Sequence, residues 1–347
     1  MSAVARIRIA PGYEISRLLK GGWQLSGGHG QIVGERALAD MAAFVEAGIT
    51  TFDCADIYTG VEDLIGAFRS AYPTLAGAVQ LHTKFVPDLS ALATLDRDGI
   101  QRIIDRSLAR LQVERLDLVQ FHWWDWNVPG HVDAALVLDE LRRAGKIRHL
   151  GVTNYDVVHL RELLDAGVPV GAHQIQYSLL DARAENGMTA LSAERGVPIL
   201  GYGALGGGFL SQAWLGAPAP APGLANRSLI KYRLIIDEFG GWARFQALLA
   251  TLDAIAARHG ATIAQVAMRW ALDRPGVAGV IVGATSARHL ADTVGVFALR
   301  LTDEDEREIA AATAGRAGPT GDCFGLERNR EGPHGRIMKY ELNARPG

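Results

Sequence analysis

The stretch GITTFDCADIYTGVEDLIG, residues 48–66, decides the fold. It begins with a β-branched and aromatic run, residues 49–52, that is typical of a buried strand and stops at an acid, Asp53. A short loop with Tyr58 follows, and apolar residues at helical spacing continue from residue 61. The stretch predicts a strand that carries an acid and a tyrosine to the loop before a helix. Taken alone, it also fits an Asp53 that caps a turn above a packed Tyr58.

The rest of the chain repeats this alternation. Apolar runs of strand length occupy residues 17–25, 49–53, 79–85, 116–122, 147–152, 171–175, 197–202 and 277–282. Helical patterns occupy residues 37–47, 61–70, 97–112, 132–144, 157–166, 188–195 and 289–294. Eight such strands predict an α/β fold, a (β/α)8 TIM barrel, because right-handed crossovers close with the helices outside. An N-terminal β-hairpin at residues 5–16 is expected to close one end of this body.

An open, doubly wound sheet is the competing architecture. Its sign is G-x-G-x-x-G at the first strand-to-helix turn, with an acid about 20 residues later. Only a glycine cluster at residues 27–30 lies near that position, and no strand with a terminal acid follows at the right distance. The barrel is therefore the predicted fold.

Two segments interrupt the alternation. Residues 203–241 form a Gly/Pro-rich segment that we expect to be a long loop after the seventh strand, either a lid or an insertion. Residues 315–347 form a C-terminal tail with little periodicity. Neither resembles an independent unit, so we expect a single domain over residues 1–347, with a core at about residues 17–300.

Composition narrows the function classes. The formal net charge of −3 supplies no basic field for a polyphosphate partner, so nucleic acid is not expected. The two cysteines, Cys54 and Cys323, do not suggest a disulfide framework. No signal-peptide core and no run of about 18 apolar residues is present. We expect a cytoplasmic protein without membrane contact, and the sequence leaves the oligomeric state open.

The end of each predicted strand carries a polar or permissive residue. These residues are Asp53 with Tyr58, Lys84, His122, Thr153 with Asn154, Gln174, Tyr202 and Gly283. In a barrel they share the rim at which chemistry collects. A phenol has a pKa of about 10, which the ammonium of Lys84 is expected to lower for Tyr58, while Asp53 holds that ammonium. His122 is expected to donate to a carbonyl oxygen, and the set contains no evident nucleophile.

These motifs resemble the aldo-keto reductases. The resemblance rests on FDCADIYTGVEDLIG, the TK of Lys84, the position of His122, GVTN, Gln174 and YGALGGGFL, and it spans residues 17–300. It implies a barrel that binds extended NADPH and reduces a carbonyl by hydride transfer. It also implies that Tyr58 is the acid, that Lys84 and Asp53 tune it, and that His122 orients the substrate. Cys54, where the family commonly has Thr, and the inserted Thr59 depart from its pattern.

The resemblance also assigns a cofactor path. Thr153, Asn154 and Gln174 are implied to hold the carboxamide and Tyr202 to stack on the nicotinamide, while Gly203, Leu205 and Gly207 line the pyrophosphate. After the eighth strand the segment GATSARHLADT departs from the family's usual adenosine-binding pattern. The candidates there are Gly283, Thr285, Ser286, Arg288, His289 and Asp292. The fit of a guanidinium to a phosphate favours NADP, with NAD possible.

The resemblance implies a small-molecule carbonyl or alcohol as the substrate, and four tryptophans are the expected pocket wall: Trp23, Trp123, Trp124 and Trp126. Three other functions stay open. The same residues permit oxidation of a secondary alcohol or sugar, and related barrels serve as nucleotide-sensing regulatory subunits. A metal-dependent hydrolase using His82, His122 and Asp125 is the third, but no H-x-H or H-E-x-x-H motif supports it, so no metal is expected.

Overall fold

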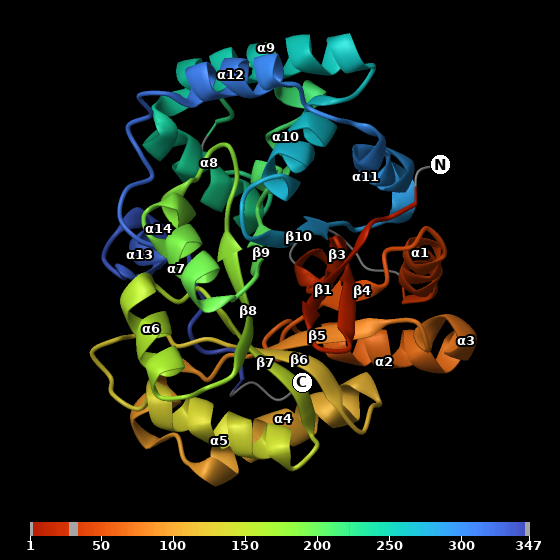
Figure 1. The fold of residues 1–347 in the computed structure, drawn as a ribbon, viewed down its shortest axis with the longest axis vertical. Helices are drawn as coiled ribbons and strands as arrows, with labels where there is room; N and C mark the ends of the chain where they lie inside the picture. The colour runs from red at the N-terminus through yellow and green to blue at the C-terminus, as the bar shows by residue number, and fades with distance from the viewer. Residues whose placement is uncertain (1–2, 28–33, 222, 344–347) are drawn as a thin grey trace.

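The computed structural model describes residues 3–27, 34–221 and 223–343. Within these residues eight parallel strands close into a barrel in the order β10-β3-β4-β5-β6-β7-β8-β9, with helices around it (Figure 1). The barrel strands are β3 (Leu18–Gly21), β4 (Thr51–Asp53), β5 (Gln80–Phe85), β6 (Leu116–Phe121), β7 (Ile147–Thr153), β8 (Val170–Gln176), β9 (Ile199–Tyr202) and β10 (Val277–Gly283). The predicted (β/α)8 fold is confirmed. Most of the glycine cluster at residues 27–30 lies outside the described residues.

The helices lie where the periodicity predicts them, within a few residues. They are α1 (Gly34–Glu46), α2 (Val61–Ala71), α4 (Arg97–Leu111), α5 (His131–Arg143), α6 (Val157–Asp165), α7 (Met188–Arg195) and α11 (Leu290–Gly295). A short α3 (Pro73–Ala76) follows α2. Aspartates begin two of these helices: the side chain of Asp96 accepts from the backbone amide of Gly99 in α4, and that of Asp156 accepts from the backbone amide of His159 in α6.

An antiparallel hairpin closes one end of the barrel, as predicted. It consists of β1 (Arg6–Ala10) and β2 (Tyr13–Ser16). Tyr13 and Ile15 of this hairpin pack with inward-facing residues near the starts of the barrel strands, among them Leu19 and Leu118. The amino-terminal end of the barrel is therefore filled, and the carboxyl end is left for a site.

The first barrel strand, β3, is shorter than expected. It ends at Gly21, and Trp23–Leu25 forms a 3-10 turn instead. The amide of Gly22 donates to the carbonyl oxygen of Asp53 at 2.7 Å, after which the chain leaves the barrel wall. This places Trp23 above the end of the neighbouring strand β4.

The expectation of a long loop at residues 203–241 is wrong in its second half. The segment contains α8 (Arg227–Phe239), whose first turn is capped by Asn226. Tyr232, Ile235 and Phe239 of α8 are buried at helical spacing. The proline-rich run before Asn226 obscured this pattern.

Five further helices of the described residues had no counterpart in the predictions. α9 (Gly241–His259) and α10 (Ile263–Leu272) precede β10, and α12 (Asp303–Thr313) packs beside α9 (Figure 1). The tail contains α13 (Gly325–Arg328) and α14 (Pro333–Arg336), and α14 packs against α8. The tail and α8 are thus packed together, although about 100 residues separate them in sequence.

Candidate active site

The parallel strands bring the predicted residues to one end of the barrel. Asp53 is the last residue of β4, Lys84 is next to last in β5, and His122 directly follows β6. The further strand-end residues are Thr153 in β7, Gln174 in β8, Tyr202 in β9 and Gly283 in β10. Because the carboxyl ends of parallel barrel strands share one rim, side chains from distant parts of the sequence meet there.

Asp53 and Lys84 form a buried ion pair. Nζ of Lys84 lies 2.6 Å from Oδ2 of Asp53, and the two side chains are only 6% and 4% exposed. The ammonium also donates to the carbonyl oxygen of Cys54 at 2.9 Å. Burial by itself lowers the pKa of Lys84, but the charge and hydrogen bond of Asp53, together with the nearby Tyr58 and Cys54, outweigh burial and raise this pKa above its ordinary value. Lys84 is therefore a fixed cation at neutral pH.

Two glutamines complete the hydrogen bonding of Asp53. Nε2 of Gln120 and Nε2 of Gln174 donate to Oδ1 of Asp53 at 2.9 and 2.6 Å. Sequence reasoning missed Gln120. Its signal was a polar residue at an inward position of the apolar strand β6, two residues after the inward-facing Leu118. Asp53 is thus the centre of a bonded network that fixes the position of Lys84.

Tyr58 lies in the loop after β4, beside this ion pair. The centroid of its ring is 5.1 Å from Nζ of Lys84 and 5.1 Å from the ring of Trp23, which packs edge-on. Burial raises the pKa of Tyr58 above its ordinary value, and Lys84 offsets only part of this effect. The predicted lowering of this pKa is wrong in its net direction, because desolvation outweighs the ammonium. The phenol therefore keeps its proton at neutral pH.

His122 is neutral, and its two ring nitrogens differ. Nδ1 faces the carbonyl oxygen of Thr153 at 3.1 Å, and since a carbonyl oxygen only accepts, Nδ1 carries the proton. Burial, with a smaller effect of Arg328, lowers the pKa of His122 to about 3, which leaves no second proton at neutral pH. Nε2 is therefore an acceptor, and it has no hydrogen-bond partner among the described residues. The prediction that His122 donates to a carbonyl oxygen is wrong for this tautomer.

Two amide side chains leave polar groups open at the rim. Asn154 has a left-handed backbone with φ of +60°, and its Oδ1 accepts from the hydroxyl of Tyr202 at 2.9 Å. Its Nδ2 remains a donor. Nε2 of Gln174 donates to Asp53, so Oε1 of Gln174 is the side-chain atom that can accept a hydrogen bond from a ligand. A donor and an acceptor of this kind match a carboxamide, whereas the hydroxyl of Thr153 donates to the backbone of Gln174 at 3.1 Å.

The glycines after β9 permit a close approach by α8. Gly203 and Gly207 have φ of +77° and +65°, and a Cβ on either would overlap the ring of Tyr232. Leu205 between them is partly buried. The backbone is thus left-handed at both glycines, and their proposed role toward a pyrophosphate stays a prediction.

The residues after β10 lie on an exposed rim of the same end. Ser286 precedes a short 3-10 turn, Ala287–His289. Gly283, Thr285, Arg288, His289 and Asp292 are exposed. His289 and Asp292 face each other at 4.0 Å. The structure therefore leaves Arg288 accessible to a ligand.

The four tryptophans separate into two groups. Trp23 packs on Tyr58, and Trp124 meets the ring of His122 edge-on at 4.3 Å, so both border the rim. Trp126 instead stacks on His159 of α6 at 3.8 Å. Trp123 is buried, with its indole N–H bonded to backbone oxygens of its own loop, and its ring meets the outward-facing Phe121. Trp123 and Trp126 therefore pack on the outer side of the strands, and their prediction as pocket residues is not supported.

Helix α8 reaches the rim with three residues that sequence reasoning missed. Nε1 of Trp23 donates to the hydroxyl of Ser228 at 3.1 Å. Nζ of Lys231 lies 5.0 Å from the ring of Tyr202 and 5.8 Å from that of Tyr232. Asn226, a residue type that commonly caps the start of a helix, was the feature of the sequence that could have indicated α8. Helix α8 thus lies across the rim between β3 and β9.

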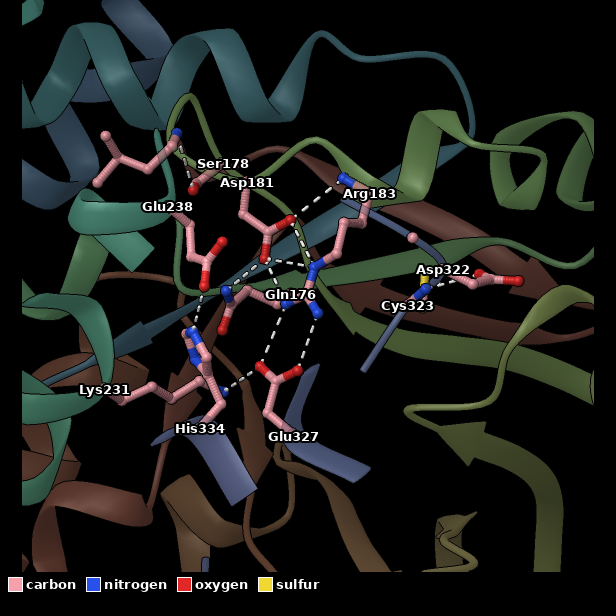
Figure 2. A network of polar contacts seen from close by, with 12 residues as sticks. Gln176, Ser178, Asp181, Arg183, Lys231, Glu238, Asp322, Cys323, Glu327 and His334 are labelled. Atoms are coloured by element: carbon pink, nitrogen blue, oxygen red, sulfur yellow. Dashed lines mark hydrogen bonds and ion pairs between the residues drawn. The ribbon is translucent and has the colours of Figure 1, made fainter. Parts of the chain in front are cut away.

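A buried charge network joins α8 to the tail and to the loop after β8. Figure 2 shows Arg183 between two carboxylates, Asp181 and Glu327. Nη2 of Arg183 lies 2.7 Å from Asp181, Nη1 of Arg183 lies 2.9 Å from Glu327, and Nζ of Lys231 lies 3.5 Å from Glu327. Burial opposes ionisation of Glu327, yet Lys231 and Arg183 outweigh it and lower its pKa to about 2. Two anions and two cations thus balance one another inside the protein.

The tail covers another part of the rim. The ring of Phe324 lies 5.5 Å from the ring of His122. The guanidinium of Arg328 donates to the backbone oxygens of Trp123, Trp124 and Asn154, the last two at 2.8 Å. These oxygens belong to the segments after β6 and β7. The tail therefore borders the site, and Arg328 ties together the two segments that carry His122 and Asn154.

Among the described residues, no helix is long and apolar enough to cross a membrane. No group of three or more His, Cys, Asp or Glu side chains in that part of the chain is placed to hold a metal ion.

The chain is similar in sequence and in fold to known proteins. The model of the aldo/keto reductase family matches residues 17–314. The chain is 30% identical over 260 residues to flagellar radial spoke protein 5 of Chlamydomonas reinhardtii, covering 63% of this chain and only 49% of that relative. It is 26% identical over 322 residues to an NADH-specific methylglyoxal reductase of Escherichia coli (strain K12), covering 86% and 95%. A glycerol dehydrogenase of Gluconobacter oxydans shares the fold with a TM-score of 0.77 at 24% identity, over 92% and 98%.

Proposed function

The chain belongs to the aldo/keto reductase family, and from this premise we propose that it reduces an aldehyde or ketone to an alcohol with NAD(P)H, with Tyr58 as the proton donor. One observation carries the proposal: a protonated phenol lies beside a lysine whose charge a buried aspartate holds in place. At this rim the phenol of Tyr58 can give its proton to the carbonyl oxygen, which gains negative charge during the reduction.

The mechanism follows from the electrostatics of three residues. As hydride reaches the carbonyl carbon, the oxygen gains negative charge and becomes a stronger base than the phenolate of Tyr58. The proton of Tyr58 then moves to this oxygen, and the ammonium of Lys84 stabilises the phenolate that remains. Asp53 keeps Lys84 charged and oriented, because a lone ammonium at this depth would lose its proton more easily.

The open amide groups fit the carboxamide of a nicotinamide. We propose that Nδ2 of Asn154 donates to its oxygen, that Oε1 of Gln174 accepts from its nitrogen, and that the ring of Tyr202 supports the flat face. When bound, the reduced nicotinamide supplies the hydride. Thr153 and the backbone of Gly203, Leu205 and Gly207 complete the proposed cofactor path.

The choice between NADP and NAD depends on the rim after β10. Arg288 is exposed there and can pair with a 2′-phosphate, together with the hydroxyls of Thr285 and Ser286. We therefore propose NADP as the preferred cofactor. The test is the dissociation constant of NADPH and of NADH, measured by fluorescence titration. Arg288→Ala should weaken NADPH and spare NADH, whereas Arg307→Ala on α12 should change neither, and an unchanged NADPH affinity in Arg288→Ala contradicts this role.

The direction of the reaction separates the main proposal from alcohol oxidation. Oxidation needs Tyr58 as a phenolate, and the raised pKa of Tyr58 makes that form scarce at neutral pH. We expect reduction to be faster near pH 7 and oxidation to gain with rising pH. Initial rates in both directions over a panel of aryl aldehydes, ketones, dicarbonyls and sugars test this. Tight cofactor binding without turnover on the whole panel would favour a regulatory subunit instead.

A further inference from the structure

Residues 340–343 of the C-terminal tail form a strap that lies against the segment after β5. The backbone amide of Leu89 donates to the carbonyl oxygen of the first strap residue at 3.0 Å. The carboxylate of Asp88, which is 6% exposed, accepts from the backbone amides of Leu342 and Asn343 at 2.8 Å each. A buried carboxylate that accepts from two backbone amides fixes the chain at that point. The strap is therefore held in one position beside the barrel.

Every polar group of the Asn343 side chain is bonded. Its Nδ2 donates one proton to Oδ2 of Asp56 at 3.0 Å and the other to the carbonyl oxygen of Val86 at 2.5 Å. Its Oδ1 accepts from the guanidinium of Arg106 in α4. Neither an aspartate nor a leucine of similar size can replace this amide, because neither donates a proton to two acceptors. Asn343 therefore joins three segments that are distant from it in sequence.

Two of these segments carry residues of the proposed proton transfer. Asp56 lies two residues before Tyr58, and Val86 lies two residues after Lys84. The backbone amide of Val86 donates to the same Oδ2 of Asp56 at 3.1 Å, and the backbone amide of Asp56 donates to the carbonyl oxygen of Lys84 at 3.4 Å. The amide of Asn343 thus binds at the point where the loop of Tyr58 meets the end of the strand that carries Lys84.

The carboxyl of Asp56 depends on these donors. Asp56 is 4% exposed, and its Oδ1 has no hydrogen-bond partner among the described residues. Burial, followed by the charge of Glu62, raises the pKa of Asp56 to about 7, and the hydrogen bonds from Asn343 and Val86 oppose this rise. A buried carboxyl that loses a donor is costly. Without the amide of Asn343, we therefore expect the loop that carries Asp56 and Tyr58 to move.

We propose that Asn343 is a positioning residue for the reaction: its amide holds the loop of Tyr58 against the strand end of Lys84 and so fixes the phenol beside the ammonium. The ring centroid of Tyr58 lies 5.1 Å from Nζ of Lys84, and the two contacts of Asn343 act on this spacing. This inference rests on the proposed reductase function. A strap that only covered the barrel would contribute to stability and leave the rate of the folded protein unchanged.

The variant Asn343→Leu tests this role, because leucine has a similar size and no donor. The strap is still held by Asp88, so we expect this variant to fold. We expect kcat for NADPH-dependent reduction of propanal to fall about 10- to 100-fold, because the reacting groups are displaced. Proton transfer belongs to the transition state, so KM for propanal and the dissociation constant of NADPH should change by less than about twofold.

The value of kcat is expressed per bound NADPH, so that unfolded protein does not contribute. An unchanged kcat in Asn343→Leu, or a loss confined to KM, would overturn the positioning role while leaving the reductase function intact. If the unmodified protein turned over none of a panel of aldehydes and ketones, the function on which the inference rests would be overturned instead.

The matched control is Glu341→Ala in the same strap. The carboxylate of Glu341 accepts from the backbone amide and the hydroxyl of Ser90 at 3.0 and 2.7 Å, in an exposed contact. Its removal should leave kcat unchanged, because Asp56 and Val86 keep their bonds to Asn343. Equal losses of kcat in Glu341→Ala and Asn343→Leu would contradict a specific role of the Asn343 amide.

A double-mutant cycle tests the route through Asp56. Asp56→Ala removes the acceptor of the Asn343 amide, so the double variant Asp56→Ala/Asn343→Leu should lose clearly less kcat than the product of the two single losses. Losses that multiply would show that the two residues act independently, and would overturn this route.

Discussion

Nζ of Lys84 and Oδ2 of Asp53 lie 2.6 Å apart inside the barrel, with both side chains almost wholly buried. Such a pair is costly to form, because two charges leave water, and even costlier to break, because one charge then stays buried alone. The other oxygen of Asp53 is held by Gln120 and Gln174. This carboxylate therefore supports both the fold of the rim and the charge next to Tyr58.

Removing that carboxylate charge should destabilise the protein and lower the pKa of Lys84. We expect Asp53→Asn to reduce the free energy of unfolding by about 3–5 kcal/mol, the usual result of leaving one partner of a buried pair. Urea unfolding at pH 7 measures it. Glu194→Gln is the control, because it removes a carboxylate from the exposed pair with Arg161 and should change little. Similar small losses in both variants would show that the pair is not buried in solution.

Arg328 should affect the reaction through the segments that it holds. Arg328→Met removes the donors to the backbone oxygens of Trp124 and Asn154, so Asn154 and the neighbouring His122 are expected to shift. A displacement of about 1 Å at a reacting centre can cost roughly 100-fold, and we expect a loss of about 10- to 100-fold in kcat/KM with weaker cofactor binding. The control is Arg330→Met, two residues after Arg328, which removes the more exposed contact with Asp125. It should leave kcat/KM and cofactor binding unchanged. Equal kinetics in the two variants would contradict the positioning role.

The sequence predicted the parts of the site that strands place. Asp53, Lys84 and His122 end apolar runs, and the parallel barrel leaves one rim for such residues. A sequence pattern does not show whether desolvation or a nearby charge has the larger effect on a pKa. The sequence therefore predicted a lowered pKa for Tyr58, whereas burial raises it. It also could not assign the tautomer of His122, which depends on a backbone oxygen of the neighbouring strand.

The contributions of α8 and the tail could not be predicted for a different reason. Lys231 and Glu327 are almost 100 residues apart in sequence, and nothing in their local pattern indicates that they share a buried network with Arg183. Pairings of this kind depend on how helices outside the barrel repeat pack against one another. The aromatic run after His122 shows the same limit, because neighbouring tryptophans on opposite sides of a strand end look alike in sequence.

Buried histidines should make the protein sensitive to acid. Burial lowers the pKa of His82, His122 and His173 to about 3 each, against about 6.5 in an unfolded chain. Between these values the unfolded chain binds a proton that the native protein does not, so stability is lost as the pH falls below 6.5. The loss is about 1.4 kcal/mol per pH unit for each histidine. Burial raises the pKa of Asp56 to about 7, so this carboxyl binds a proton in the native protein before it does so in the unfolded chain. Its effect on stability as the pH falls is therefore opposite to that of the histidines, and it offsets the loss from one histidine.

A single variant isolates this effect. His82→Gln keeps a hydrogen-bond partner for the hydroxyl of Tyr13, which lies 2.9 Å from Nε2 of His82, and removes the titrating ring. We expect the plot of unfolding free energy against pH, measured with urea between pH 6 and 4, to become shallower by about one proton. His289→Gln, on the exposed rim, should leave the slope unchanged. A slope that His82→Gln does not alter would mean that this histidine titrates normally in the native protein.

The central claim is that the phenol of Tyr58 supplies the proton for carbonyl reduction. The most direct measurement is the rate of NADPH-dependent aldehyde reduction in Tyr58→Phe, with NADPH binding followed by fluorescence in the same sample. Tyr155→Phe is the matched control, because it removes a buried phenol that has no partner among the described residues, from the outer side of the barrel. We predict that Tyr58→Phe binds NADPH like the unmodified protein and loses reduction by at least about 100-fold, while Tyr155→Phe keeps it. Retained turnover in Tyr58→Phe would contradict the account.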